Sequence, residues 1–315
     1  MASIENIWLG AGIIVSSFTT LALNGVVLTT IAANSEFRMH TSYKIMLLMG
    51  VFDVAQSSMH FISGIFTVLQ YHASVLVQNI LAAVISPSSL SFVLVTILLS
   101  FNRFVLFCLP RWEKQIFSPF ANRIWLAFVV AFYTFFASIQ MSNRVYTYYD
   151  VTSYKWSYDS TYPWTDARAN IVLVYQLVGI FFAFCLYIAI TIKLWRVRTE
   201  MGASSSFKAN RKILIQAVVI MVYCTLQIFL WHEIDNFIEP GNIQNYVMNM
   251  LWIWNSALNC FLCIVVNGKI RKRIKRMFKK TLFMKVSSMQ TSRAQSTGFV
   301  QDHGKPTTSV AVVVL

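Results

Sequence analysis

Two ionisable side chains stand within stretches of the chain that are otherwise apolar. Asp53 occurs in MLLMGVFDVAQ, and Arg103 follows Asn102 in LLSFNRFVLF. If these stretches cross a membrane, each charge is costly to bury, and such groups commonly bind an ion, carry a proton or drive a conformational switch. These residues are therefore the first candidates for a functional role.

Each charge also has a structural interpretation, and the sequence leaves both interpretations open. Asp53 either binds a cation or a proton, or belongs to an intramembrane polar network satisfied by asparagines of neighbouring helices, Asn24, Asn255 and Asn259. Arg103 either contacts a partner protein, or bends its guanidinium towards the lipid headgroups.

The sequence offers no set of residues for catalysis. It contains no His-Glu-x-x-His pattern, no glycine-rich phosphate loop and no nucleophile elbow. An aspartyl protease within the membrane needs two carboxylates at the same depth, and Asp53 stands alone. We therefore expect a protein that is not an enzyme, with no catalytic residue and no metal-ligating set.

Composition indicates that hydrocarbon surrounds most of this 315-residue chain, which is 57% hydrophobic and 12% charged. A soluble domain has about twice that share of charged residues. A membrane-spanning helix needs roughly 20 apolar residues, and seven stretches suit this role: Ile7–Ala33, Ile45–Leu69, Ile80–Leu109, Ile124–Met141, Ile171–Leu194, Ile213–Ile234 and Ile243–Val266. Barrel strands would be shorter and would alternate polar with apolar residues. We predict an all-α membrane protein, a bundle of seven transmembrane helices.

Lysine and arginine residues predict the orientation of this bundle. Of the 26 in the chain, 23 fall on one side and 3 on the other, and the positive side faces the cytoplasm. The predicted organisation is a short extracellular N-terminus (1–6), the bundle (7–268), an amphipathic basic helix (269–284) and a disordered cytoplasmic tail (285–315). The net charge of +14 then faces anionic lipid and protein partners, and no nucleic-acid partner is expected.

Four polar residues occupy positions typical of rhodopsin-like G-protein-coupled receptors: Asn24 in LNGVVL, Asp53, Arg103 at the end of the third helix, and Asn259 in the seventh. The segments YKIMLLMGVFDVAQSSMHFISGIFTV, LLSFNRF and LWIWNSALNCFLCIVVNGKIRKR resemble nematode serpentine chemoreceptors of class T. The resemblance extends over most of residues 7–280 and implies a receptor that couples to a G protein.

The resemblance implies roles for the matching residues, with two departures. Arg103 corresponds to the arginine that meets the G protein in the active state. Asn102 stands where such receptors usually keep an acid that restrains this arginine, so elevated basal activity is expected. Asn259 is followed by Cys260 and Cys263 instead of the proline and tyrosine of the family motif.

The disulfide of rhodopsin-like receptors is absent as well. Its cysteine in the third helix would fall near Gln78, and the loop from Asn143 to Arg168 contains no cysteine. We expect packing to hold this loop in place.

The resemblance places the ligand between the helices on the extracellular side. Eight Tyr or Trp residues in the loop from Asn143 to Arg168 suit either a lid over a small, moderately apolar ligand or an aromatic belt at the membrane surface. Ile85 stands where amine receptors keep an aspartate, so a charged amine would lack its counter-ion. The predicted ligand-pocket residues are Gln56, His60, Ile85, Trp156, Trp164 and His232.

The cytoplasmic side carries the predicted sites for partners. In KIRKRIKRMFKK, which has eight basic residues in twelve, Ile270, Ile274, Met277 and Phe278 share one helical face, so this helix is predicted to lie on anionic lipid. The predicted coupling residues are Arg103, Asn102, Arg111, Lys114, Lys208, Arg211 and Lys212. Candidate phosphosites for an arrestin-like partner are Ser287, Ser288, Thr291, Ser292, Ser296 and Thr297.

The sequence therefore predicts a G-protein-coupled chemosensory receptor for an unknown small-molecule ligand, acting through a heterotrimeric G protein in the plasma membrane of sensory neurons. No cofactor is expected apart from a sodium ion at Asp53. The alternative is a multi-span transporter or a ligand-gated channel subunit. Against it stand the lack of an internal repeat and the single proline, Pro87, that lies well inside a helix.

Overall fold

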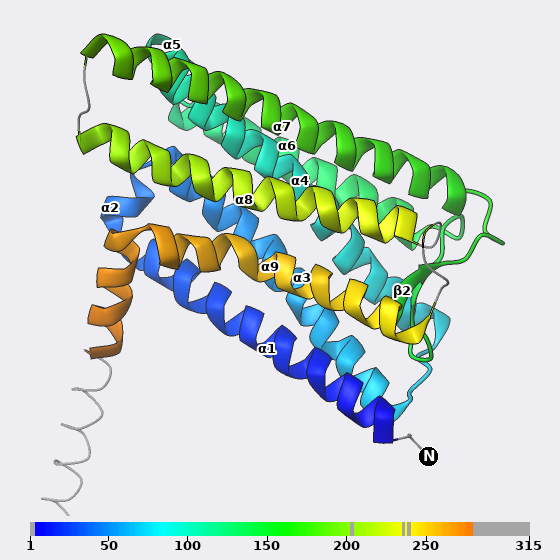
Figure 1. Cartoon of the computed structure of the whole chain (residues 1–315). Coiled ribbons are helices and arrows are strands. Elements are labelled where there is room, and N and C mark those ends of the chain that lie inside the picture. The colour runs from blue at the N-terminus through cyan, green and yellow to red at the C-terminus, as the bar shows by residue number, and fades with distance from the viewer. Residues whose placement is uncertain (1–3, 202–204, 235–236, 238–240, 280–315) are drawn as a thin grey trace, which may run out of the picture. The chain divides into compact units, whose positions relative to one another are not determined.

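Each of the seven apolar stretches forms a long helix in the computed structural model (Figure 1). It describes residues 4–201, 205–234, 237 and 241–279, and their side chains except those of 197–201, 205–215, 217 and 232–233. The long helices are α1 (Ile4–Ala33), α3 (Thr41–Leu69), α4 (Val75–Cys108), α6 (Pro119–Met141), α7 (Thr165–Met201), α8 (Ser205–Glu233) and α9 (Asn242–Val266). The short elements are α2 (Ser35–Arg38), α5 (Pro110–Ile116), β1 (Thr147–Asp150) and β2 (Lys155–Tyr158).

The chain divides into two units, Met1–Ile270 and Arg271–Leu315. The first unit holds the bundle and the hairpin of β1 and β2. In the second, residues 271–279 continue a helix that begins at residue 268, within the predicted basic helix of 269–284. The predicted disordered tail and all six candidate phosphosites lie outside the described residues.

The predicted seven-helix membrane architecture is confirmed. Six described helices are long and apolar enough to cross a membrane, and α8 contains a shorter apolar run, Val218–Trp231. Large apolar side chains such as Phe18, Phe135 and Phe181 are more than 60% exposed on the bundle surface. Such a surface suits hydrocarbon and not water, so the protein is embedded in a membrane.

Several helices begin earlier than the apolar stretches predicted. Helix α6 begins at Pro119 and not near Ile124, because Ser118 caps it: the Ser118 hydroxyl accepts a hydrogen bond from the Ala121 amide at 3.1 Å. Proline at the first helical position and serine before it favour this start. The polar first turn was missed because apolar length alone set the predicted boundary.

Glycines allow α1 and α3 to approach closely, and the two helices lie side by side (Figure 1). A methyl group on Gly10 of α1 would lie 2.6 Å from Val68 Cγ2 and 2.8 Å from the Val68 backbone nitrogen. A methyl group on Gly64 of α3 would lie 3.0 Å from the Ile14 backbone nitrogen. Small residues commonly permit such backbone contact between membrane helices.

The hairpin of β1 and β2 was not predicted. The two strands pair antiparallel, with Thr147 opposite Tyr158 and Asp150 opposite Lys155. The Asp150 carboxylate accepts hydrogen bonds from the Thr152 amide at 2.9 Å and the Ser153 hydroxyl at 2.6 Å, which closes the turn. Although burial raises the pKa of Asp150, the hydrogen bonds from Ser153 and Thr152 outweigh it and lower that pKa below its usual value. The turn therefore keeps a charged cap.

Replacing Gly10 by alanine is expected to destabilise the bundle by about 1–3 kcal/mol, the usual cost of overpacking. The added methyl group meets backbone as well as side chain at Val68, so α1 and α3 must separate. The thermal unfolding midpoint of the purified receptor in lipid nanodiscs measures this loss.

Gly25→Ala is the matched control in the same helix, because a methyl group at Gly25 meets nothing within 4 Å. It should leave the midpoint unchanged or raise it slightly, since alanine favours the helix. Equal midpoints for the Gly10 and Gly25 variants would contradict the close α1–α3 contact.

Candidate functional site

Arg103 is buried at the end of α4, where it binds to α7. Its side chain is 8% exposed, and its Nη1 donates a hydrogen bond to the Tyr187 hydroxyl at 3.0 Å. Tyr187 belongs to a buried cluster that includes Met221 of α8 and against which Phe104 and Phe107 of α4 pack. The guanidinium therefore stays within the bundle and does not bend out to lipid headgroups, and its partner contacts the helices on both sides.

No carboxylate restrains Arg103 among the residues that the structure describes. An ion pair joins Lys269 to Glu36, 2.7 Å apart and exposed to solvent, and it does not involve Arg103. Asn102 does not contact the guanidinium but accepts a hydrogen bond from the Ser42 hydroxyl at 2.7 Å. Adjacent side chains of α4 thus bind two different helices: Asn102 binds α3 and Arg103 binds α7.

The cytoplasmic end of α9 is held by a second set of contacts. Asn267 donates a hydrogen bond to the Tyr43 hydroxyl at 2.8 Å, and Lys269 pairs with Glu36. The hydrogen bond from Lys269 to Glu36 raises the pKa of the lysine. Because Lys269 is fully exposed, this pair adds little to stability.

Asp53 has no hydrogen-bond partner among the described residues. Its side chain is fully buried and both carboxylate oxygens are unpaired. The structural interpretation, in which asparagines satisfy this carboxylate, was wrong for the described residues. Each asparagine has other partners: Asn24 donates to the Thr20 and Ser256 carbonyls, Asn255 accepts from the Cys224 thiol, and Asn259 accepts from Gln216 and the Cys263 thiol.

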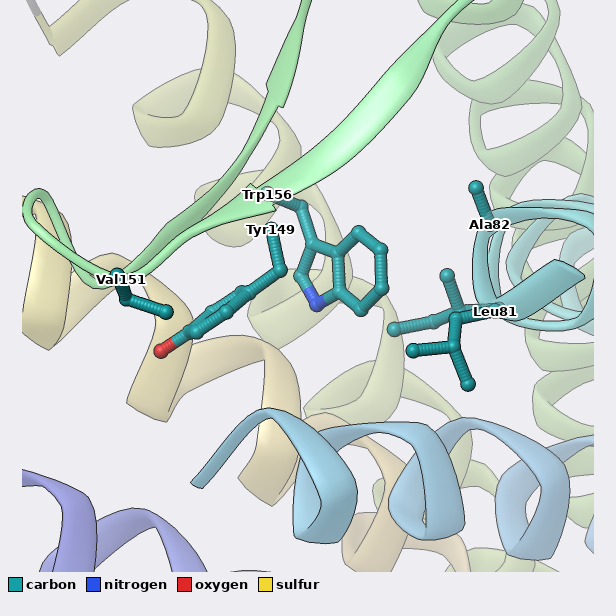
Figure 2. Close-up of a cluster of buried hydrophobic side chains, with 6 residues drawn as sticks. Leu81, Ala82, Tyr149, Val151 and Trp156 are labelled. Carbon is teal, nitrogen blue, oxygen red and sulfur yellow. The ribbon is translucent and has the colours of Figure 1, made fainter. Parts of the chain in front are cut away.

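At the opposite end, the hairpin enters the bundle and forms a buried cluster. Trp156 of β2 lies between Tyr149 of β1 and Leu81 of α4 (Figure 2), and its side chain is 3% exposed. The rings of Tyr149 and Trp156 are 5.6 Å apart between centroids. Ile85 belongs to the same cluster. These contacts make the hairpin a lid on the outer end of the bundle.

Gln78 holds this lid through both ends of its carboxamide. The Tyr149 amide donates to Gln78 Oε1 at 3.0 Å, and Gln78 Nε2 donates to the Tyr149 carbonyl at 3.3 Å. The Tyr149 hydroxyl also binds Thr67 Oγ1 at 2.8 Å. Burial raises the pKa of the Tyr149 phenol, so this hydroxyl stays neutral. The expectation that packing alone holds the loop was incomplete, because Gln78 clamps it where the related receptors have a cysteine.

A cavity of about 310 Å³ lies beneath the hairpin, between β2, α7, α8 and α9. It is lined by Lys155, Trp156, Ser157, Tyr158, Ala169, Trp231, Ile234, Asn245 and Met248. A smaller space of about 40 Å³ adjoins Tyr158, Trp231 and Trp252, with Ser86, Gln176 and Gln227 among its polar neighbours. Most ligand pockets combine apolar walls with a few polar groups in this way.

The structure places the predicted pocket residues in three different settings. Trp156 lines the cavity. Gln56 accepts a hydrogen bond from Trp252 Nε1 at 2.9 Å, and the buried His60 ring meets the Trp252 ring edge-on at 5.0 Å. Trp164 is half exposed and lies under the Arg144 guanidinium, so it lies outside the cavity. The side chain of His232 is not among those described.

The predicted cytoplasmic residues are only partly described. Arg111 and Lys114 are exposed on α5, where a partner can reach them. Lys208, Arg211 and Lys212 lie in α8, and their side chains are outside the described set. Of the predicted lipid-facing residues, Ile270 is buried within the first unit and Phe278 of the second unit is exposed.

Sequence reasoning missed several residues that position these sites. Tyr187 and Gln78 lie in largely apolar helices, and a polar residue in such a helix gives no signal for its partner. The hairpin did have a signal: TYYDVTSYKWSY is rich in aromatic and β-branched residues around an Asp-Val-Thr-Ser turn.

These helices and their polar contacts form a seven-helix membrane bundle. A crystal structure of squid rhodopsin matches this chain with a TM-score of 0.69, over 88% of this chain and 86% of that one, at 15% sequence identity. That likeness concerns the fold. No curated protein sequence matches the chain.

The family follows from the sequence. The model of the family described as serpentine type 7TM GPCR chemoreceptor Srt matches residues 1–287, and the chain belongs to this family. The predicted resemblance to serpentine chemoreceptors is confirmed. The protein is a chemoreceptor of the G-protein-coupled class, a sensory signalling protein and not an enzyme. Family membership favours the receptor over the transporter or channel alternative.

Replacing Gln78 by methionine should loosen the lid while preserving side-chain length. The change leaves the buried Tyr149 amide and carbonyl without a partner, at a cost of about 1–3 kcal/mol. We expect a lower thermal midpoint and faster hydrogen exchange at the Tyr149 amide.

Gln115→Met serves as the control, because Gln115 is exposed on α5 at the other end of the bundle. It should change neither quantity. Exchange at Tyr149 as slow in the Gln78 variant as in the wild type would show that packing suffices to hold the hairpin.

Proposed function

We propose that this chemoreceptor binds a small molecule in the cavity beneath the hairpin and activates a heterotrimeric G protein at its cytoplasmic end. The observation that carries the proposal is Arg103, buried at the end of α4 and bonded to Tyr187 of α7 without a carboxylate partner among the described residues. An arginine held by a single neutral hydroxyl is released more readily than one held in an ion pair.

Activation follows as a shift in population between two arrangements of the helices. A ligand acts only through its preference for one arrangement, and the cavity contacts α7, α8 and α9. Tyr187 of α7 and Met221 of α8 belong to one buried cluster. Relative movement of α7 and α8 therefore disturbs the partner of Arg103 and frees the guanidinium for the G protein, together with Arg111 and Lys114 on α5.

The remaining partners are proposed from the sequence of the cytoplasmic side. The basic helix that begins at residue 268 binds anionic lipid of the plasma membrane, in sensory neurons, through its lysines and arginines. Phosphorylation of the serine and threonine residues of the tail provides acidic sites for an arrestin-like protein. The exposed Phe278 supplies an apolar contact for the lipid.

A sodium ion at Asp53 forms part of the proposal. Support comes from the fully buried carboxylate, whose two oxygens have no partner among the described residues. A buried carboxylate without a counter-charge is strongly disfavoured. The ion would neutralise Asp53, with hydroxyl and carbonyl oxygens as the remaining ligands.

Replacing Arg103 by alanine should remove G-protein activation, because the residue proposed to meet the partner is lost. Basal signalling in reporter cells measures this without a ligand, and we expect at least a tenfold loss at unchanged surface expression. Arg123→Ala is the matched control, since Arg123 is an exposed arginine at the start of α6. Normal basal signalling in the Arg103 variant would contradict the assignment.

A second variant tests the restraint in the same assay. Asn102→Asp places a carboxylate beside Arg103 and should lower basal signalling, because an ion pair restrains the guanidinium more firmly than the hydrogen bond to the neutral Tyr187 hydroxyl does. If basal signalling in the wild type is no higher than in this variant, the proposal that Arg103 is only weakly restrained in the wild type is contradicted.

Sodium should stabilise the wild-type receptor and not the Asp53→Asn variant. The measurement is the thermal midpoint in sodium chloride and in choline chloride at equal ionic strength, which separates ion binding from screening. We expect a higher midpoint in sodium for the wild type alone. An equal response of both proteins would rule out Asp53 as the ion site.

A further inference from the structure

A second buried arginine lies at the outer end of the bundle, beside the cavity. Arg168 of α7 is 5% exposed, and its Nη2 donates a hydrogen bond to the Ser86 hydroxyl of α4. Its Nε and Nη1 are buried and have no hydrogen-bond partner among the described residues. A guanidinium offers five donors, so most of the hydrogen-bonding capacity of Arg168 is unused.

The neighbours of Arg168 are residues that line the cavity and the space next to it. Ala169 and Tyr158 line the cavity of about 310 Å³, while Ser86, Tyr158 and Val172 border the smaller space. Tyr158 lines both spaces and lies near Arg168. Arg168 itself is not among the lining residues, so a ligand in the cavity would reach the guanidinium after rotation of the Tyr158 side chain.

The cavity carries a second cation and no described acid. Lys155 is among its lining residues, and no aspartate or glutamate is. Asp150 lies opposite Lys155 in the hairpin, but its carboxylate is bound by Thr152 and Ser153. Neither Lys155 nor Arg168 forms an ion pair within the described residues. Neither cation is therefore neutralised by direct pairing with an acid among the described residues.

We propose that the ligand of this cavity is a small organic acid whose carboxylate is bound by Arg168. This proposal rests on the proposed function, since it names the chemical class of the ligand for that site. The carboxylate takes the unused Nε and Nη donors in the bidentate geometry that arginine favours. Lys155 adds a second positive charge, and the apolar body of the acid packs against Trp231 and Met248, which line the same cavity.

The chemistry of the described walls favours an anion over a cation. An amine would bring a third positive charge into a site that already holds Lys155 and Arg168, and Ile85, buried in the neighbouring cluster, supplies no counter-ion. A neutral ester of the same shape keeps the apolar contacts but cannot neutralise the guanidinium. The difference in affinity between an acid and its ester therefore measures the contact between carboxylate and guanidinium apart from the apolar packing that both compounds share.

The test uses the purified full-length receptor in nanodiscs and a panel of aliphatic and aryl carboxylates of about four to ten carbons, each beside its methyl ester. Ligand binding to the folded state raises the thermal midpoint in proportion to affinity and concentration. We expect one or more acids to stabilise the wild type, with affinities at least ~10-fold above those of their esters, as for a charge-assisted contact. If no acid exceeds its ester, the proposal is overturned.

Substitutions of Arg168 then test whether this arginine binds the carboxylate. Arg168→Gln should weaken binding of the best acid at least ~10-fold while leaving its ester unchanged, and Arg168→Lys should lose less because it keeps the charge. Arg144→Gln is the matched control, since Arg144 is also near this end but lies over Trp164 at the surface. Wild-type affinity in Arg168→Gln, or equal losses in the Arg168 and Arg144 variants, would overturn the site.

Binding and signalling are read separately, so the two proposals fail separately. The thermal midpoint requires no G protein, so it reports binding of the acid whether or not the receptor couples. An acid that binds through Arg168 but changes no signal in reporter cells would count against coupling and leave the ligand class standing. A signal evoked only by neutral or cationic compounds would support coupling and overturn the proposal that the ligand is an organic acid.

Discussion

A polar group inside the bilayer has no water to bind, and this constraint governs the whole structure. Backbone amides satisfy it by forming seven long helices, and polar side chains satisfy it by binding across helix interfaces. Asn24 does so through the Ser256 carbonyl, and Arg103 through the Tyr187 hydroxyl. Both oxygens of Asp53 and two nitrogens of Arg168 have no described partner, and these are the groups to which we assign the proposed sodium ion and the proposed carboxylate ligand.

The constraint also explains what the sequence alone could predict. Hydrocarbon requires long apolar stretches and a positive cytoplasmic side, so the seven helices, their order and the place of Arg103 followed from composition. The hydrogen-bond partners of the polar side chains did not follow from composition. Whether Arg103 meets Tyr187 depends on the rotation of α4 against α7, and Asn102 meets Ser42 of α3 for the same reason. Rotation is set by packing of the whole bundle, which no local pattern records.

Gln78 shows how one such contact changes the behaviour expected of the outer end. A disulfide would join the lid to α4 covalently, whereas two hydrogen bonds from one carboxamide contribute only a few kcal/mol. The buried Tyr149 and Trp156 rings supply the rest of the attachment. A lid held in this way needs no oxidising environment and opens locally at lower cost, which gives a ligand a route to the cavity beneath it.

Helix α7 links the two ends of the proposed mechanism. It carries Arg168 beside the cavity and Tyr187 beside Arg103, 19 residues further along, a span of about 28 Å in a continuous helix. If the proposed anion draws Arg168 far enough towards the cavity to break its hydrogen bond to Ser86 of α4, α7 would be loosened from α4 at the outer end. Among the described residues, a second hydrogen bond between side chains of α4 and α7 joins Arg103 to Tyr187. Because one rigid helix carries both partners, loss of the outer contact changes the free energy of the inner one, and ligand charge is thereby coupled to release of Arg103.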